Sequence, residues 1–539
     1  DTRSNYKSNY ALYEIELFRI RPSANYTVEL YEEPTGASVS LVASGRMESV
    51  STGHQDIDAR VANITGQTPS YGILTFALGS IFGFEGLVSV DAEGYAVWYY
   101  VTGQQTMAFD QWENGNILMN TLPVGISAGN ARINSVLQIV SPTGESLEKY
   151  VEECSGSWKN WCEESHEASF NEKGNVISIR SHASHDTEGV FFKGKKWNIL
   201  KNDQIVLWNP GIMNELVIRY ELSDYLNKSA IKGYDMPNSF TNFTMRCGYS
   251  GSSAEPAVGL EWMHASAATP IGNDYVLVAL RNLDTLMLFN ADGSGLEWSI
   301  SSSIPGLNNF TFLPEDSYSM ARFYDPHTPN LRTDEHNTTF LSLISDGSNA
   351  PGCTTSYFTH CFSRGMEYIL DLENMTATLS WQFEWPLNSS SFIGDVEYTD
   401  VFEFDGGSIE YMSEVDRYLV AFTSIEVNEL YGGYSYAFEV DMKGRHRNVI
   451  KLPPSTWASG LYRAKPFPNV YKESPEPPFD KKKYSTLDHE PSSPLNFSCH
   501  SSSGSCDWTM YFDTRSAVCL SWRLLRIERA NLSQGAECK

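Results

Sequence analysis

Residues 90–98 read Val-Asp-Ala-Glu-Gly-Tyr-Ala-Val-Trp, and this short stretch decides the fold. An apolar strand leads into an Asp-x-x-Gly turn, and a second strand then carries Trp98. The same unit returns at residues 289–298, and degenerate copies lie at residues 370–381 and 441–444. Apolar runs bounded by Asp, Asn and Gly are typical of β-hairpins. The chain is therefore predicted to be an all-β protein built from repeated hairpins.

A second repeated unit is a turn rich in Gly and Asn ahead of an apolar strand. It occurs at residues 113–119, 172–178, 272–278 and 336–342. Hairpins that alternate at irregular intervals of tens of residues are typical of propeller blades with inserted loops. The two repeats predict a β-propeller over residues 67–472, and their unequal spacing leaves the number of blades open.

The regions that flank the repeats have different patterns. Residues 12–30 alternate apolar and polar side chains around a turn, which predicts a hairpin of a small N-terminal β-sandwich in residues 1–66. Residues 473–498 are rich in Pro, Ser and Lys and predict a linker. Residues 499–539 are predicted to form a C-terminal β segment with disulfides. Because 539 residues exceed the usual limit for one core, more than one domain is expected.

Ten Asn-x-Ser/Thr sequons predict exposed loops with N-linked glycans, and therefore a secreted, extracellular or cell-surface protein. The sequence begins at Asp1 without Met, which we interpret as the removal of a signal peptide. No apolar stretch reaches the roughly 20 residues that a membrane-spanning helix needs. The sequons lie at Asn25, Asn63, Asn227, Asn242, Asn309, Asn337, Asn374, Asn388, Asn496 and Asn531.

The nine cysteines agree with an oxidising compartment, because eight of them fall into four short intervals that disulfides could close. Spacing does not determine connectivity, so this pairing is a hypothesis, and it leaves Cys247 over. The sequence has none of the tight Cys-x-x-Cys knuckles that a zinc site would need. The four intervals are Cys154 to Cys162, Cys353 to Cys361, Cys499 to Cys506 and Cys519 to Cys538.

The formal net charge is −27, from 39 basic and 66 acidic residues. This acidity argues against nucleic acid and anionic membranes as partners, because a negative surface is repelled by both. The sequence contains no Walker A, Rossmann or Gly-x-Ser-x-Gly motif. We therefore expect neither a nucleotide cofactor nor a metal.

Three histidines hold the same place relative to the repeated turns. His166, His264 and His327 each lie shortly before a predicted hairpin, and Arg281 follows in the strand after His264. In a propeller this phase points toward one end of the central channel, so the side chains are expected to converge. One histidine beside a turn is usually a surface or capping residue, whereas three at one phase with a nearby arginine indicate a site.

The same stretches resemble the arylsulfotransferase (arylsulfate sulfotransferase) family, in particular its secreted eukaryotic members. In residues 262–298 a His precedes a turn, a strand with Arg and a strand ending in Trp. Residues 323–327 resemble the family's F-x-x-Q-H segment, residues 363–377 its S-R…L-D…T-A strands, and residues 459–463 its later Y-R element. The order of these motifs over roughly residues 70–525 carries the resemblance, which implies a six-bladed β-propeller with an added β-sandwich.

The resemblance also implies an activity, the transfer of a sulfuryl group from an aryl sulfate to a phenolic acceptor without a cofactor. His327 would be the sulfated nucleophile, His264 and Arg281 would bind the sulfuryl oxygens, and His166 would assist proton transfer. Sulfuryl transfer is similar to phosphoryl transfer, with a loose transition state and charge on the equatorial oxygens. Fixed imidazole and guanidinium groups suit that charge, and a neutral imidazole is a nucleophile at neutral pH.

Two positions depart from the family pattern. Pro326 stands where the family has Gln, and Ser266 stands where it has Asn. The alternative hypothesis is a non-catalytic extracellular glycoprotein that uses its propeller as a scaffold, as a homo-oligomer or filament or in a surface layer. Retention of the three histidines and Arg281 favours the enzyme, whereas the ten sequons and the altered neighbours favour the scaffold.

Overall fold

The structure is a computed structural model in which strands are the main regular element. Two compact units make up the chain: residues 1–61, 88–100 and 481–539 form one, and residues 62–87 with 101–480 form the other. The structure describes residues 15–17, 25–32, 40–48, 57, 60–79, 84–122, 134–142, 144–153, 162–192, 195–212, 216–226, 241–245, 257–314, 321–351, 363–384, 391–393, 396–398, 406–425, 434–452, 462–467, 493–501, 504–513 and 522–528.

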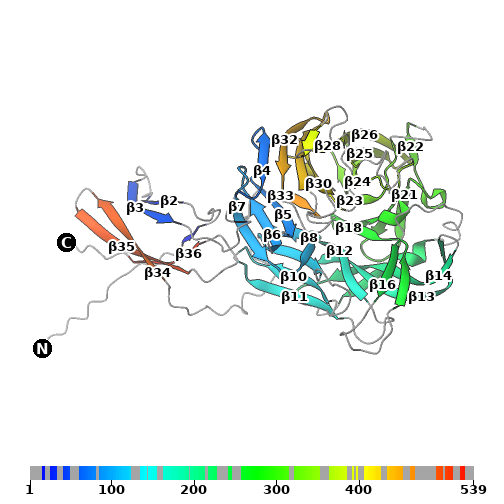
Figure 1. The fold of residues 1–539 in the computed structure, drawn as a ribbon, viewed down its shortest axis with the longest axis horizontal. Helices are drawn as coiled ribbons and strands as arrows, with labels where there is room; N and C mark the ends of the chain where they lie inside the picture. Colours follow the sequence, from blue (N-terminus) through cyan, green and yellow to red (C-terminus); the bar gives the residue numbers. More distant parts are fainter. Residues whose placement is uncertain are drawn as a thin grey trace. The chain divides into compact units, whose positions relative to one another are not determined.

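Six small sheets lie in a ring, so the fold is a six-bladed β-propeller (Figure 1). This confirms the all-β prediction, the propeller and the six blades that the family resemblance implied. Blade 1 contains β8 (Gln105–Gln111), β9 (Ile117–Leu122), β10 (Asn134–Val140) and β11 (Ser146–Glu153). Blade 2 contains β12 (Cys162–Phe170), β13 (Val176–Phe192), β14 (Lys195–Trp208), β15 (Val217–Glu221), β16 (Thr241–Met245) and β17 (Ala257–Glu261). Blade 3 contains β18 (Ala265–Ile271), β19 (Tyr275–Leu280), β20 (Thr285–Asn290) and β21 (Leu296–Ser301).

The other three blades include strands from distant parts of the chain. Blade 4 contains β22 (Thr311–Leu313), β23 (Pro326–Thr333), β24 (Thr339–Ser345), β25 (Arg364–Asp371) and β26 (Thr376–Glu384). Blade 5 contains β29 (Ser408–Met412), β30 (Arg417–Ile425), β31 (Tyr434–Asp441), β32 (His446–Lys451) and β4 (Asn63–Gly66). Blade 6 contains β33 (Ala464–Phe467), β5 (Ile73–Gly79), β6 (Glu85–Val90) and β7 (Ala96–Val101). The remaining short elements of this region are β27 (Ser391–Ile393), β28 (Val396–Tyr398), and the 3-10 helices η2 (Leu222–Tyr225), η3 (Arg281–Leu283) and η4 (Pro305–Leu307).

The two sequence repeats correspond to two hairpins of a blade. The unit at residues 90–98 joins the third strand to the fourth, and its copies lie between β20 and β21, β25 and β26, and β31 and β32. The Asp91 side chain closes its turn by accepting the backbone N–H groups of Glu93 and Tyr95 at 2.9 and 3.1 Å. Trp98 on the following strand is buried. The second unit joins the first strand to the second in blades 1 to 4.

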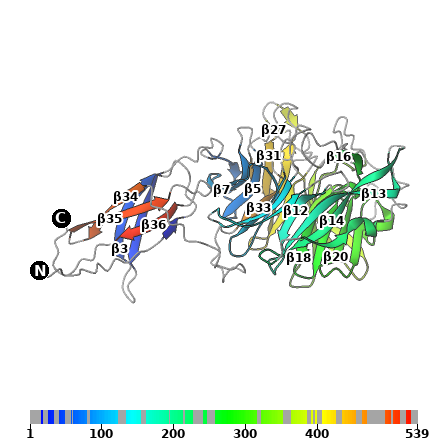
Figure 2. The same ribbon diagram turned by 90° about the horizontal axis from the view of Figure 1, so that it is seen from below.

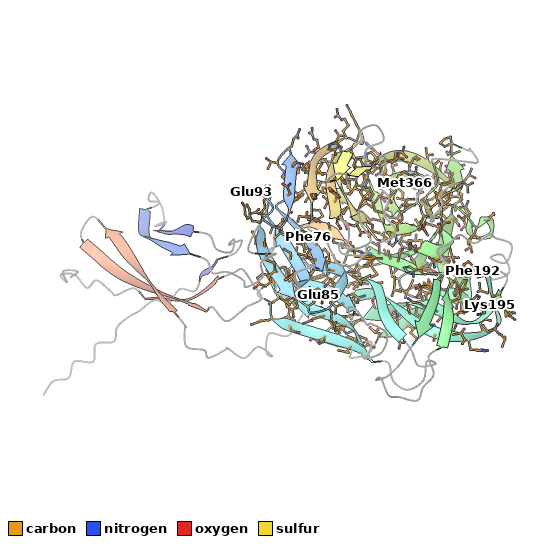
Figure 3. All side chains as sticks on the ribbon, viewed as in Figure 1. Phe76, Glu85, Glu93, Phe192, Lys195 and Met366 are labelled. Atoms are coloured by element: carbon orange, nitrogen blue, oxygen red, sulfur yellow. The ribbon has the colours of Figure 1, made fainter. Side chains whose placement is uncertain are left out.

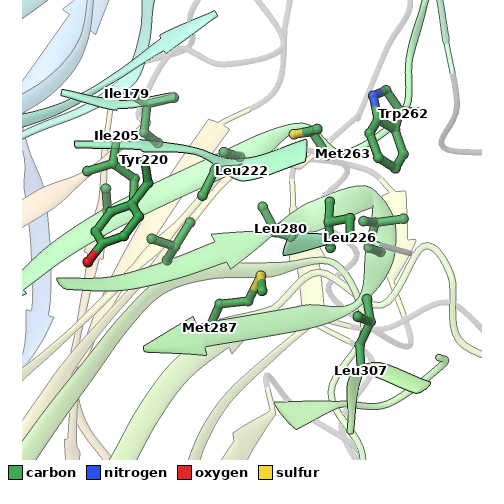
Figure 4. Packing of buried hydrophobic residues seen from close by; sticks show 14 of the residues in the cluster. Ile179, Ile205, Tyr220, Leu222, Leu226, Trp262, Met263, Leu280, Met287 and Leu307 are labelled. Carbon is green, nitrogen blue, oxygen red and sulfur yellow. The ribbon is translucent and has the colours of Figure 1, made fainter. Parts of the chain in front are cut away.

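Apolar side chains fill the space between neighbouring blades (Figure 3). Between blades 2 and 3, Trp262, Met263 and Leu280 are fully buried in one cluster with Ile179 and Met287 (Figure 4). Burying one such side chain stabilises the fold by about 1.5–3 kcal/mol. Apolar packing therefore holds blades 2 and 3 together.

In each blade the strand nearest the centre of the ring is called the first strand here, and these strands are β8, β12, β18, β23, β29 and β33 (Figure 1). The first strands of neighbouring blades contact one another. The Ser266 hydroxyl of β18 donates to the carbonyl of Pro326 in β23 at 2.7 Å. The Ser408 hydroxyl of β29 donates to the carbonyl of Ala464 in β33 at 3.0 Å. We call the end of the ring at which these strands begin the start end.

Pairing between distant segments closes the ring. In blade 6, β33 is antiparallel to β5, with Ala464 opposite Phe76, and in blade 5 β4 is antiparallel to β32. Pairing removes the exposed edges that single strands would leave. Arg463, just before β33, donates two hydrogen bonds of 2.7 Å to the carboxylate of Glu167 in β12, and both side chains are buried. This ion pair joins the closing strand to blade 2.

The segments near the two ends of the sequence share one sheet in the other unit (Figure 2). The register of β34 with β35 places Cys499 opposite Cys506. Directly opposed residues of antiparallel strands lie about 4.5–5.5 Å apart at Cα, which is compatible with a disulfide. The bond stays a prediction, because the side chains of all eight predicted cysteines lie outside the described residues. The boundary predicted at 472 also lies outside them, whereas Ser498 lies within β34. The strands, in spatial order, are β1 (Ile15–Leu17), β36 (Trp522–Glu528), β35 (Gly504–Asp513), β34 (Ser493–Ser501), β3 (Ser40–Glu48) and β2 (Asn25–Glu32).

Exposure of the sequons can be assessed where their side chains are described. Asn63, Asn309, Asn337 and Asn374 are exposed, as an attached glycan requires. The side chains of the other six sequon asparagines lie outside the described residues, and glycan occupancy stays a prediction at all ten. No helix in the part of the chain that the structure describes is long and apolar enough to cross a membrane.

Replacing Arg463 tests the closure of the ring. Arg463→Met leaves the Glu167 carboxylate buried without its partner, so we expect the free energy of unfolding of the propeller to fall by about 3–5 kcal/mol. The double variant Glu167→Met/Arg463→Met removes both charges and should recover a large part of this loss. Denaturant titration followed by tryptophan fluorescence measures both values. A double variant no more stable than Arg463→Met would contradict the role of the pair.

Candidate active site

The three predicted histidines lie on the first strands of consecutive blades. His166 lies within β12, His264 directly precedes β18, and His327 is the second residue of β23. In each case the pairing with the second strand shifts register beside the histidine. Such bulges redirect side chains and are common near active sites. The structure thus places all three backbones at the start end, while the side chain of His166 lies outside the described residues.

Left-handed backbone conformations surround two of these histidines. The φ angle is 49° at His264, 50° at Asp325 and 41° at Thr328. For a residue other than glycine this conformation costs on the order of 1–3 kcal/mol, so surrounding contacts must hold it. The N–H of Arg281 donates to the carbonyl of His264 at 3.0 Å, and the N–H of Asp325 donates to Asp284 Oδ1 at 2.8 Å. The strained turns are therefore fixed by neighbouring loops.

His327 is fully buried between two polar neighbours. Its Nε2 lies 3.0 Å from Asp346 Oδ2, and its Nδ1 lies 3.4 Å from the hydroxyl of Tyr462. Because an ionised carboxylate only accepts hydrogen bonds, the Asp346 contact favours a proton on Nε2. Arg281 approaches the same oxygen, with 3.9 Å between Nε and Asp346 Oδ2. Asp346 therefore links the predicted nucleophile to the predicted sulfuryl-binding arginine.

His264 is held by charged groups of blade 2. Its Nδ1 lies 3.2 Å from Glu261 Oε1, and Lys201 Nζ donates to the same oxygen at 2.7 Å. Burial alone would raise the pKa of the Glu261 carboxyl, but Lys201 and His264 hold that pKa well below its usual range. The Asp203 carboxylate accepts the backbone N–H of Ala265 at 2.8 Å. Blade 2 therefore anchors the start of β18.

Two buried aspartates, Asp284 and Asp325, lie close to the residues of the site. Asp325 Oδ2 accepts the hydroxyl of Ser348 at 2.6 Å and the N–H of Asn349 at 2.7 Å. Burial, and then the nearby charge of Asp325, raise the pKa of the Asp284 carboxyl. Burial also raises the pKa of Asp325, although the charge of Arg281 opposes that shift. The two carboxyls therefore hold protons more tightly than exposed aspartates do.

His264, Arg281 and His327 come together around two carboxylates. Arg281 and His327 share Asp346, and the charges of Arg281 and His264 both act on Asp325. Imidazole and guanidinium N–H groups can bind an anion, and the imidazoles can also transfer protons. Within the described ranges, no group of three or more metal-ligating side chains is arranged to hold an ion.

Sequence reasoning did not assign Asp346, Tyr462 or Glu261 to the site. Asp346 directly follows β24, whose last residue Ser345 pairs with Pro326, so the strand register brings it to the histidine. That register is the signal that could have found it. Tyr462 belongs to a family-like motif that implied no role, and no sequence signal separates Glu261 from the other acidic residues.

The two departures from the family pattern lie in contact with each other. The Ser266 hydroxyl donates to the Pro326 carbonyl at 2.7 Å, and the Tyr462 hydroxyl lies 3.5 Å from the carbonyl of Ser266. A backbone carbonyl accepts in the same way from any residue, so proline does not prevent this contact. The strands that carry the two site histidines are therefore tied together despite both changes.

These features define a six-bladed propeller protein with a buried centre of imidazole, guanidinium and carboxylate groups. The family model described as Arylsulfotransferase (ASST) matches residues 73–449, which is more than half of the chain. The protein therefore belongs to the arylsulfotransferase family. The match begins at the first residue of β5 and ends within β32.

Comparison with curated proteins gives no match. Among solved structures, a luciferin-regenerating enzyme is 8% identical with a TM-score of 0.29, over 75% of this chain and 93% of that chain. The tail fibre of Staphylococcus aureus phage P68 is 9% identical with a TM-score of 0.24, over 85% of this chain and 77% of that chain. Likenesses this distant carry no argument about function.

The aspartate pair predicts a specific dependence of stability on pH. Because the pKa of Asp284 is raised above its unfolded value of about 3.9, the native state binds more protons, and stability falls as pH rises through the native pKa. Asp284→Asn removes this loss, so the variant should gain stability relative to the wild type between pH 4 and pH 8, taken as approximate limits. Thermal unfolding across this range measures the gain, with exposed Asp274→Asn as the matched control. A difference that stays constant with pH would exclude this role for Asp284.

Proposed function

We propose that the start end of the ring is the active site of an arylsulfate sulfotransferase-like enzyme, in which His327 carries the sulfuryl group. Family membership supports the proposal. The observation that carries it is the position of the Asp346 carboxylate, 3.0 Å from His327 Nε2 and 3.9 Å from Arg281 Nε. Donors that hold one small anion between them also suit the anionic oxygens of a sulfuryl group.

In the first half-reaction, the aryl sulfate displaces Asp346 from between His327 and Arg281. Once Asp346 is displaced, Nε2 gives its proton to water and Nδ1 takes a proton from water, so His327 reacts as the tautomer whose Nδ1–H donates to the Tyr462 hydroxyl oxygen and whose Nε2 carries the lone pair. Nε2 attacks the sulfur, so the N–S bond forms while the S–O bond to the aryl group breaks. The electron pair leaves on the phenolate oxygen, which takes a proton from His166.

The second half-reaction runs through the same groups. His166 takes the proton of the acceptor phenol, and the phenolate oxygen attacks the sulfur of the sulfohistidine. The S–N bond breaks, and its electron pair returns to Nε2 of His327. Arg281 and His264 stabilise the equatorial oxygens in both steps, where the charge of a loose transition state lies.

The His327→Ala variant tests this mechanism. It should abolish transfer from a chromogenic aryl sulfate to a phenol, because the nucleophile is lost, while exposed His336→Ala should keep the wild-type rate. With donor alone, the wild type should release one equivalent of phenol and yield a sulfated peptide containing His327, detected by mass spectrometry. Full turnover by a folded His327→Ala variant would exclude the sulfohistidine.

A second candidate function is a secreted, N-glycosylated scaffold, and the charge balance of the site favours it. Glu261, Asp325 and Asp346 already engage the lysine, arginine and histidines, and Asp284 adds a fourth buried carboxyl. An anionic donor must compete with these groups. The exposed sequons described above support the secretory part of this proposal.

The scaffold predicts self-association without turnover. Light scattering of the secreted, glycosylated chain should show a mass well above one chain, because a layer or filament component contacts its own copies. The same measurement after enzymatic removal of N-glycans separates protein contacts from glycan mass. A strictly monomeric protein at all concentrations, or one with arylsulfate turnover that depends on His327, would contradict the scaffold.

A further inference from the structure

A pocket of about 420 Å³ lies at the end of the ring opposite the histidines. Its lining includes the last residues of two first strands, Met412 in β29 and Phe467 in β33, and Asp110 next to the end of β8. Glu410 in the middle of β29 and Lys465 in β33 complete the charged part of the wall. Because these strands begin at the start end, their last residues mark the other end, which we call the far end. The volume falls within the range of about 300–1,000 Å³ that is usual for small-molecule sites.

The charges of the far-end pocket leave two carboxylates without an ion pair among the described residues, Glu410 and the exposed Glu414. Lys465 Nζ lies 3.2 Å from Asp110 Oδ1, and Arg463 behind the wall is paired with Glu167. Both cations are therefore engaged. By contrast, the Glu410 carboxylate has neither a hydrogen bond nor an ion pair with any residue that the structure describes. Burial raises the pKa of this carboxyl even though Lys465 lies nearby.

A further unmatched polar group comes from another blade. Tyr71, which precedes β5, lines the same pocket, and its side chain is 7% exposed. Its hydroxyl is buried and has no hydrogen-bond partner among the described residues. A buried hydroxyl without a partner costs about 1–3 kcal/mol, so a ligand that bonds to it recovers that energy. The Glu410 carboxylate and the Tyr71 hydroxyl oxygen can therefore each accept a hydrogen bond from a ligand.

We propose that the far-end pocket binds a small organic cation, a protonated primary amine with an aromatic body. The ammonium group donates to Glu410 and to the Tyr71 oxygen, and the aromatic body lies against the rings of Tyr411 and Phe467, which also line the pocket. An anion finds no unengaged cation there, and a neutral alcohol leaves the Glu410 charge uncompensated. This site is separate from the sulfuryl chemistry proposed for the start end.

Calorimetric titration of the full chain with 2-phenylethylamine tests the proposal. The amine should bind, while 2-phenylethanol and 3-phenylpropionate, which keep the aromatic body, should bind at least about tenfold more weakly. Glu410→Gln should lower the affinity for the amine by a similar factor. Tyr71→Phe should lower this affinity less, because the substitution removes only one neutral hydrogen bond. Glu373→Gln, at an exposed turn of blade 4, is the matched control and should leave the affinity unchanged.

A variant at Lys465 keeps the proposal testable if Glu410→Gln fails to fold. Lys465→Met frees the Asp110 carboxylate, so it should strengthen amine binding, whereas a pocket for anions would lose its ligand. The proposal is overturned if the amine does not bind, if the carboxylate probe binds as well as the amine, or if Lys465→Met weakens the amine. Thermal unfolding of each variant shows whether the fold is intact.

Discussion

The ion pair between Glu167 and Arg463 is the contact on which the centre of the ring depends. Each of these buried charges would cost several kcal/mol without the other, so the pair sets the separation of β12 and β33. The N–H of Ala168 donates to the same carboxylate at 3.0 Å, which helps to satisfy its remaining lone pairs. Tyr462 immediately precedes Arg463 and reaches His327. The closure of the ring and the surroundings of His327 therefore depend on the same two adjacent residues, Tyr462 and Arg463.

Charge at the start end decides between the two candidate functions. Two unit charges about 4 Å apart interact by roughly 4 kcal/mol at an effective dielectric constant of 20, so one extra carboxylate matters. The raised pKa values of Asp284 and Asp325 favour protonation, which makes this region less negative than its formal count. Asp346 then remains as the carboxylate directly between His327 and Arg281. Catalysis requires the donor to displace it, whereas a scaffold would use it as a permanent partner.

Local turn chemistry could be predicted from the sequence, whereas contacts between strands could not. Asp91 and Gly94 mark a hairpin because an Asx turn and a left-handed residue need those types. The predicted turns also showed that His166, His264 and His327 each lie shortly before a hairpin, at the same place in their blades. The approach of Asp346 to His327 depends instead on cross-strand register and a bulge, which spacing along the chain does not reveal. For the same reason, no local pattern indicated that the first and last segments would share a sheet.

The two ends of the ring are close enough to influence each other. Arg463 and Lys465 are two residues apart on one short segment, about 7 Å along an extended strand, and alternate residues of a strand point to the same face. The charges of Arg463 and Glu167 accordingly act on Glu410 at the far end. A cation bound at Glu410 would draw that carboxylate toward its ionised form and alter the field around Arg463. Because Tyr462 adjoins Arg463, this effect would extend to the hydroxyl that faces His327.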